Sequence, residues 1–427
     1  MQHRSVSRRL SIAVLCLTCL VSATSSGQVA DEQSAYTLQR AIDEALASNP
    51  GIRAAGYEID IATARRDLAA LPAPMSIQAE AENFLGSGAT NSFDSVETTL
   101  QLSRVLELGD KRDLRESLGN TRIDLAETDR TLARLDLSAE VARRFIYLVA
   151  LQEEGLVATQ AVTLAESTLE TVSRRVEVGS NSEAELATAE VALAKAQLER
   201  SALEARVESA RLSLATLWGI ENPGDLIAQA QLFNLEPPQT LDSLKARVSD
   251  NPSLLRSIDE RRVLEAERRL AQTRERADLG LSFGVRRLGE TDDTALVFGA
   301  SLPLGRRQRA DAEVAAVSVA LNQLDAQREL RRLDAISVVS GLHAEMRNAY
   351  DYYVALRDVL LPRSEDAADL YREGFEVGSF SLLEFNRAQQ ELLALRREAL
   401  AAAERYHTTL VDIEQLLGGT YESGVIQ

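Results

Sequence analysis

The chain has 427 residues and a formal net charge of −18, from 65 acidic and 47 basic side chains. This acidic balance argues against nucleic acid as a partner, because binding a phosphate backbone needs a basic face. Aromatic residues make up only 4% of the chain. Helix-forming residues dominate instead, which is typical of long helices packed as coiled coils.

Residues 1–23 have the pattern of a secretory signal peptide. Three arginines precede an apolar run, residues 10–21, that is too short to span a bilayer as a helix. A membrane anchor is the alternative interpretation. Both cysteines of the chain, Cys16 and Cys19, lie in this segment, so the mature chain has no thiol chemistry. We expect residues 24–36 to form a flexible segment after cleavage.

A short helix is predicted from Thr37, and Asn49-Pro50 then starts a helix of about 20 residues, with proline in its first turn. Two runs of alternating apolar and polar residues follow within residues 75–104 and predict a β-hairpin. Each run has about 10 residues, the length of a transmembrane β-strand. A soluble hairpin packed on helices shows the same alternation, and this pattern taken alone favours that alternative.

From residue 110 to residue 178 there is no proline, and apolar residues recur at heptad spacing. Residues 177–182 then read Glu-Val-Gly-Ser-Asn-Ser, and a second apolar stripe follows. Glycine accepts positive φ at a helix C-terminus, and serine accepts a hydrogen bond from a free N–H at the next N-terminus. The segment is therefore predicted to be the tip of an antiparallel helical hairpin.

The second half repeats the first. Asn251-Pro252 matches Asn49-Pro50, and a long helical stretch, kinked at Pro362, leads to residues 376–381, Glu-Val-Gly-Ser-Phe-Ser. This second tip lies 199 positions after the first, and nine positions of the following apolar stripe keep the same offset. The chain is therefore predicted to be an internal duplication.

These boundaries give the predicted organisation of the whole chain. The parts are a first repeat at 37–222 with its β-hairpin at 75–104 and tip at 178–182, a linker at 223–240, a second repeat at 241–419 with its β-hairpin at 277–303 and tip at 377–381, and a tail at 420–427.

The predicted fold is mainly α with a small β part. Four strands cannot close a membrane barrel, and an open sheet in lipid would leave unpaired edges. If the strands enter a membrane, several copies related by rotation must therefore pool them, with the long helices closing a second tube below. From a different class, the chain could be a soluble periplasmic coiled-coil scaffold or adaptor.

The sequence resembles the TolC-type outer-membrane efflux channels. The resemblance rests on the doubled Val-Gly-Ser tips, the two Asn-Pro starts, and Leu361-Pro362 before Tyr371-Arg372-Glu373-Gly374. Residues 107–112, Glu-Leu-Gly-Asp-Lys-Arg, are most similar to the cobalt–zinc–cadmium efflux branch, which usually has a second glycine where this chain has Asp110.

The resemblance implies a homotrimer in the outer membrane lipid of a Gram-negative bacterium, with four strands per protomer and a long periplasmic extension. It implies a periplasmic adaptor and an inner-membrane RND-type pump as partners. The expected function is passive export of metal cations or small toxic compounds. The exit duct of a type I-like protein secretion system would have the same fold, and the sequence leaves that alternative open.

The resemblance also assigns candidate site residues. The residues expected to dock the adaptor are Val178, Gly179, Ser180, Val377, Gly378 and Ser379. The residues expected at the periplasmic entrance are Glu185, Glu384 and Arg387. Three copies of Glu384 would form an acidic ring with mutually raised pKa values. The alternatives are ordinary turn chemistry at the tips, a solvated carboxylate at Glu384, and an Arg387–Glu384 pair.

Catalysis, cofactor binding and metal ligation have no support in the sequence. The three histidines, His3, His343 and His407, are isolated, and no nucleophile–base pair or phosphate-binding glycine loop is present. We therefore expect no enzyme activity, no cofactor and no resident metal.

Overall fold

The computed structural model describes residues 36–419. The predicted signal peptide, residues 24–35 and the tail from 420 lie outside the described residues. The elements follow in the order α1 (Leu38–Ser48), α2 (Pro50–Ala69), β1 (Ser76–Glu82), η1 (Gly88–Thr90), β2 (Glu97–Leu106), α3 (Lys111–Glu177), α4 (Glu183–Ala215), η2 (Thr216–Trp218), α5 (Leu241–Ala246), η3 (Arg247–Asp250), α6 (Pro252–Thr273), β3 (Leu279–Leu288), β4 (Asp293–Ser301), α7 (Arg307–Ala355), η4 (Leu356–Leu360), α8 (Leu361–Glu376) and α9 (Leu382–Leu416).

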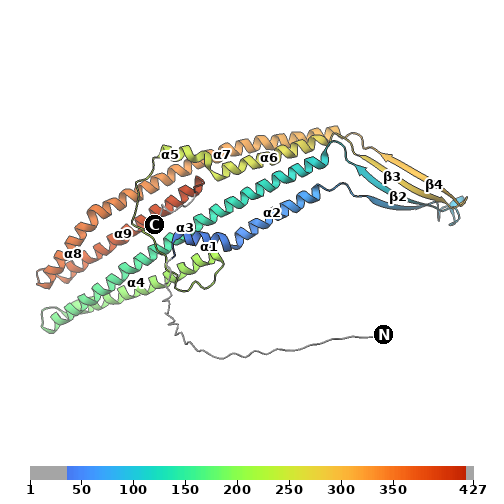
Figure 1. Ribbon diagram of the computed structural model, residues 1–427. Helices are drawn as coiled ribbons and strands as arrows, with labels where there is room; N and C mark the ends of the chain where they lie inside the picture. The colour runs from blue at the N-terminus through green and yellow to red at the C-terminus, as the bar shows by residue number, and fades with distance from the viewer. Residues whose placement is uncertain (1–35, 420–427) are drawn as a thin grey trace, which may run out of the picture. The chain divides into compact units, whose positions relative to one another are not determined.

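The long helices form two series of neighbours that share α3. Near the sheet, α2 packs on α3, α3 on α6, and α6 on α7. Toward the tips, α4 packs on α3, α3 on α9, and α9 on α8. Figure 1 shows the strands beyond the ends of α2, α3, α6 and α7, and the two helical-hairpin tips at the opposite end. Within residues 36–419, no helix is long and apolar enough to cross a membrane.

In each repeat, an asparagine caps the helix that precedes the β-hairpin. The Asn49 side chain caps α2 by accepting from the Gly51 N–H at 2.7 Å, and its amide donates to the carbonyl of Leu217 at 2.8 Å. Asn251 caps α6 in the same way and donates to the carbonyl of Leu416 at 2.7 Å. Because Leu217 and Leu416 lie at the ends of their hairpins, one side chain joins the start of α2 or α6 to the end of the helical hairpin in the same repeat.

The segment between the repeats is part of the core. Leu226, Ala228 and Leu232 are buried in the largest apolar cluster, together with residues of α1, α3 and α9. Tyr36 bridges to Ala228 and stacks on Trp218 at 5.5 Å. Tyr36, the last residue of the segment expected to be flexible, is held by backbone hydrogen bonds with Ile227 and Gln229, each 2.9 Å long.

The predicted kink near Pro362 appears as a π-helical turn, η4, between α7 and α8. Proline has no N–H to donate and its ring crowds the carbonyl four residues earlier. That carbonyl belongs to residue 358, which lies inside η4. The irregular turn therefore lies one turn before the proline.

The four strands form one antiparallel sheet in the order β1-β2-β3-β4. The register places Ile77 opposite Leu102, Leu102 opposite Phe283, and Phe283 opposite Phe298. Because side chains alternate between the two faces, this row and its neighbours give the sheet one apolar face. The rows between them carry the polar residues Ser76, Gln78, Thr99, Gln101, Ser103, Ser282 and Arg286. Among the described residues, β1 and β4 each have one edge without a strand partner.

Candidate functional site

Each tip begins with a glycine that ends a long helix. Gly179 has φ +73° and Gly378 has φ +80°, a backbone conformation that side chains with a Cβ rarely adopt. The N–H of Ser180 donates to the carbonyl of Arg175 at 2.8 Å, and that of Ser379 to the carbonyl of Gly374 at 2.7 Å. These bonds satisfy carbonyls that the helix end leaves free.

A capping box then starts the outgoing helix of each tip. The hydroxyl of Ser182 accepts from the N–H of Glu185, whose carboxylate accepts from the N–H of Ser182 at 2.8 Å. Ser381 and Glu384 form the same pair, with the return bond at 2.9 Å. The backbone N–H and the hydroxyl of Ser381 lower the pKa of Glu384. In the single chain this is opposite to the raised pKa expected for an acidic ring.

The apolar residue before each tip glycine is presented to solvent. Val178 is 74% exposed and Val377 is 79% exposed. Within the described chain, no hydrogen bond is found for the hydroxyl of Ser180 or Ser379, because the capping role belongs to the serines two positions later. Turn formation therefore accounts for both glycines, but it does not account for the exposed valines.

The two tips contact each other. The Arg175 guanidinium donates to the carbonyl of Phe375 at 2.7 Å and lies 4.9 Å from the centroid of that ring. Phe375 stacks on Phe385 at 5.1 Å, and both belong to an apolar cluster with Val172 and Ala189. Since these residues come from α3, α4, α8 and α9, the tips of both hairpins share one small core.

The two tips also differ in chemistry. Position 175 is arginine in the first repeat, and its counterpart 199 positions later is Gly374. Position 181 is asparagine, and its counterpart Phe380 packs its ring over Gly374 and against Tyr371, 4.7 Å between centroids. A Cβ on residue 374 would collide with that ring. The glycine and the phenylalanine are therefore a matched pair, and they make the second tip the more aromatic one.

The remaining predicted entrance residue, Arg387, is exposed on α9. It forms no ion pair with Glu384 or with any other residue that the structure describes, so the predicted Arg–Glu pair is not found within one chain. The structure places Glu185 and Glu384 at equivalent positions, in the first turns of α4 and α9.

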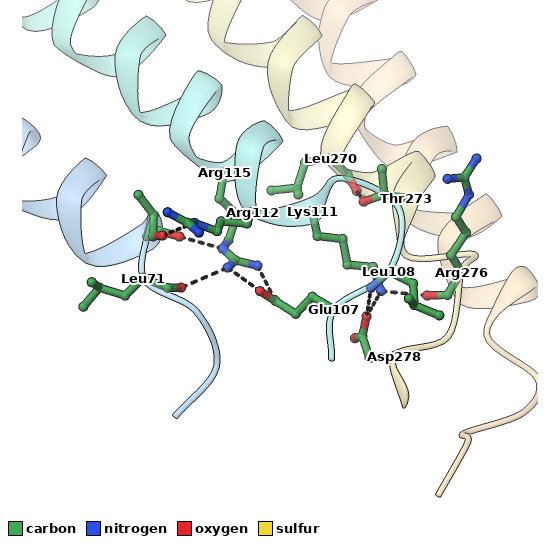
Figure 2. Close-up of polar contacts among 12 residues, drawn as sticks. Leu71, Glu107, Leu108, Lys111, Arg112, Arg115, Leu270, Thr273, Arg276 and Asp278 are labelled. Carbon is green, nitrogen blue, oxygen red and sulfur yellow. Dashed lines mark hydrogen bonds and ion pairs between the residues drawn. The ribbon is translucent and has the colours of Figure 1, made fainter. Parts of the chain in front are cut away.

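A second constellation lies at the other end of the helices, where β2 meets α3 (Figure 2). The Lys111 side chain is only 7% exposed; it donates to the carbonyl of Arg276 at 2.6 Å and pairs with Asp278 at 2.5 Å. Asp278 also accepts from the Leu108 N–H and lies 3.5 Å from Arg306. Burial opposes ionisation of Asp278, but these donors outweigh it and hold the pKa of the carboxyl below its usual range.

Two arginines on α3 join the same junction to α2. Arg115 holds Glu107 with both nitrogens, at 2.5 and 2.9 Å, and its Nε donates to the carbonyl of Ala69. The hydrogen bonds from Arg115 lower the pKa of Glu107. Arg112 donates to the carbonyl of Ala70 at 2.6 Å. These bonds satisfy carbonyls at the end of α2 that have no helical partner.

The backbone conformation explains why residues 107–112 contain glycine at position 109 and aspartate at position 110. Gly109 has φ +86°, and a Cβ there would meet the Arg276 side chain. Asp110 has φ +59°, also left-handed, which aspartate tolerates better than most residues. The efflux-channel branch that this motif resembles usually has a second glycine at this position. Glycine would adopt the same conformation without strain.

Sequence reasoning missed the roles of Arg175, Gly374, Phe380 and Asp278. The first three could have been noticed in the sequence, because the two repeats have different residues at these positions near the tips. Asp278 could not, since its partner Lys111 is 167 residues away.

Comparison with known proteins agrees with this geometry. The model of the outer membrane efflux protein family matches residues 41–220 and 245–419. The chain is 26% identical over 393 residues to the cobalt-zinc-cadmium resistance protein CzcC of Cupriavidus metallidurans, covering 90% of each chain. It is 30% identical over 263 residues to the nickel and cobalt resistance protein CnrC of the same organism, covering 60% of this chain and 62% of that protein.

Solved structures have the same fold. A crystal structure of CusC superposes with a TM-score of 0.72 at 17% identity, covering 90% of this chain and 92% of that one. The outer membrane protein VceC of Vibrio cholerae gives a TM-score of 0.71 at 16% identity, covering 90% and 97%. The expected fold class is confirmed, and because the family model spans both repeats, this chain belongs to the outer membrane efflux protein family.

Proposed function

We propose that this chain is the outer-membrane exit duct of a tripartite efflux pump for divalent metal cations. The observation that carries the proposal is the four-stranded sheet, which has one apolar face, one polar face and, within residues 36–419, two edges without strand partners. In lipid, such a sheet is stable only when further copies pair with β1 and β4 and close a barrel. Three copies give twelve strands and leave room for water inside.

The metal assignment is supported by the relatives CzcC and CnrC, whose names state resistance to cobalt, zinc, cadmium and nickel. In the described part of the chain, no group of three or more His, Asp or Glu side chains is arranged to hold a metal ion. A conduit needs none, because tight binding would slow release. The chain is proposed to conduct its substrate passively, without catalysis or a cofactor, and an inner-membrane RND-type pump supplies the energy.

The tips are proposed to dock a periplasmic adaptor. Val178, Ser180, Val377 and Ser379 are exposed at the ends of the hairpins, and Gly179 and Gly378 set the turns that present them. The exposed valines favour a partner that offers small apolar side chains at its own tip. The shared core under Arg175 holds the two contact points at a fixed spacing.

The periplasmic entrance is proposed to carry Glu185, Glu384 and Arg387. The Glu384→Gln variant tests this role cleanly, because glutamine at the third helical position keeps the capping box while the charge is removed. Conductance of the purified protein in planar bilayers should shift toward lower cation preference in this variant. Glu391→Gln, further along α9, is the matched control and should leave the preference unchanged.

The transport proposal is tested in a metal-sensitive Gram-negative host that carries a cognate adaptor and pump, with and without this chain. Expression should raise the tolerated concentrations of zinc, cobalt and cadmium and lower the metal content of the cells. Tolerance that rises for organic dyes and not for metals would assign a different substrate class. Export of a polypeptide, with metal tolerance unchanged, would favour the secretion duct.

A further inference from the structure

Two loops that join the sheet to the helices carry the same short pattern. Residues 106–109 read Leu-Glu-Leu-Gly before α3, and residues 302–305 read Leu-Pro-Leu-Gly before α7. Both glycines have positive φ, +86° and +76°, so both loops turn at the same point. The leucine before each glycine is exposed: Leu108 by 46% and Leu304 by 87%, the highest value among large apolar side chains in residues 36–419.

These leucines continue the apolar surface of the sheet. Leu106 and Leu302 are also exposed, by 39% and 53%, and so is Met75 at the start of β1, by 63%. A contiguous exposed apolar surface of this kind marks a place where a protein meets another protein or a membrane. This surface extends from the sheet onto the loops that contain Met75, Leu108 and Leu304. Its border therefore lies where the sheet meets the helices.

The same border is rich in basic side chains, although the chain as a whole is acidic. Its nine basic residues outnumber its seven acidic ones. The basic residues are Arg104, Lys111, Arg112, Arg115, Arg274, Arg276, Arg306, Arg307 and Arg309. The acidic residues are Glu107, Asp110, Asp113, Glu275, Asp278, Asp311 and Glu313. Counted over residues 104–115, 274–278 and 306–313, this local excess of two positive charges contrasts with the net charge of −18 and is compatible with an anionic partner.

Some of these cations hold the junction together, and others are free to bind. Lys111 and Arg115 are committed to Asp278 and Glu107. Arg104, Arg276 and Arg309 are exposed and form no ion pair with any residue that the structure describes. Figure 2 shows the Arg276 guanidinium pointing away from the network around Asp278.

The free arginines lie beside features that fit a headgroup. Arg309 lines an opening of about 300 Å³ together with two ion pairs, Arg274–Glu313 and Arg306–Asp278. Arg104 is on the apolar face of the sheet, opposite Leu281 and near the helix end of β2. An arginine there can keep its stem in hydrocarbon and its guanidinium at the phosphate level.

We propose that this surface binds the headgroups of anionic phospholipids in the periplasmic leaflet of the outer membrane. We call it the junction belt: the loops 106–109 and 302–305 with Arg104, Arg276 and Arg309. Its leucines enter the acyl region, and its arginines pair with headgroup phosphates, because the planar guanidinium can donate two parallel hydrogen bonds to phosphate oxygens. The proposal rests on the outer-membrane location proposed above, and it adds the lipid class and the residues that recognise it.

Native mass spectrometry of the full-length protein in neutral detergent tests the junction belt. The probes are dioctanoyl phosphatidylglycerol and dioctanoyl phosphatidylcholine, with inorganic phosphate as a soluble competitor. Each surface arginine contributes about fivefold to binding of an anionic lipid. The variant Arg104→Gln/Arg276→Gln/Arg309→Gln should therefore bind phosphatidylglycerol about 100-fold more weakly, and Arg309→Gln alone about fivefold. Phosphatidylcholine binding should stay unchanged in both variants.

The matched control is Arg328→Gln, an exposed arginine on α7 without an ion pair in the described chain. It should leave binding of both lipids unchanged. An equal loss in this control, an equal loss for phosphatidylcholine, or displacement of phosphatidylglycerol by millimolar inorganic phosphate would each overturn the proposal. Channel conductance distinguishes failure of this proposal from failure of the proposed function. A wild-type chain that conducts ions but does not prefer phosphatidylglycerol would contradict the junction belt alone. A wild-type chain that never conducts would contradict the proposed exit duct.

Discussion

The Lys111–Asp278 pair is expected to stabilise the junction between strands and helices more than any exposed ion pair. Replacing Lys111 by methionine keeps the apolar stem but leaves the Asp278 carboxylate and the Arg276 carbonyl without their main donor. Breaking a buried pair costs about 3–5 kcal/mol. The lower figure applies here, because Asp278 is 19% exposed and keeps the Leu108 N–H and Arg306.

For a chain of this length, about 3 kcal/mol corresponds to a fall of about 3–6 °C in the apparent Tm. The assay is thermal unfolding followed by the helical circular dichroism signal, at one scan rate in one detergent. Lys195→Met, an exposed lysine on α4, is the matched control and should change the Tm by less than about 1 °C. Equal Tm values for Lys111→Met and Lys195→Met would refute the reasoning.

The same pair predicts a pH dependence. The pKa of Asp278 is depressed in the folded chain, so its stabilisation is present above the unfolded value of about 3.9 and is lost as the pH falls through the folded pKa. The Tm difference between the wild type and Asp278→Asn should therefore be full at pH 7 and should narrow below about pH 4. A difference that grows on acidification would contradict this assignment.

Three further predictions concern the tips. Val377→Asp should weaken adaptor binding at least tenfold in a pull-down without lowering the Tm, while Val191→Asp, at an exposed valine on α4, should leave binding intact. Gly374→Ala should destabilise the second tip by about 1–3 kcal/mol by displacing the Phe380 ring, and proteolysis there should be faster. Gly341→Ala, where an added Cβ meets only open space, should leave proteolysis unchanged. Ser381→Ala should cost about 1 kcal/mol and speed hydrogen exchange in the first turn of α9, whereas exchange unchanged from wild type would show that the capping box is dispensable.

Much of the fold could be predicted because it depends on local chemistry and on repetition. Asn49 and Asn251 indicate where helices begin, and the tip glycines indicate where helices end. Because the sequence is duplicated, an assignment in one half can be compared with its counterpart in the other. The strands were visible because alternation by two residues gives the sheet two different faces. These signals lie within a few residues of the structure that they predict.

The parts that could not be predicted depend on contacts between distant segments. Nothing near Lys111 indicates that Asp278 is its partner, and nothing near Arg175 indicates that its guanidinium holds Phe375 of the other repeat. The segment between the repeats looked like a simple connection, yet Leu232 and its neighbours fill the core. The capping role of Glu384 and the lowered pKa of its carboxyl in the single chain became clear only from the observed hydrogen bonds.

The most direct test of the central claim is the location and native mass of the full-length protein, expressed with its own N-terminus in a Gram-negative host. The account predicts a species that detergent extracts from the outer membrane and that has three times the mass of the mature chain, because β1 and β4 must find partners in other copies. A monomer released with the soluble periplasmic fraction would contradict the account, since the apolar face of the sheet would then have to be covered within one chain.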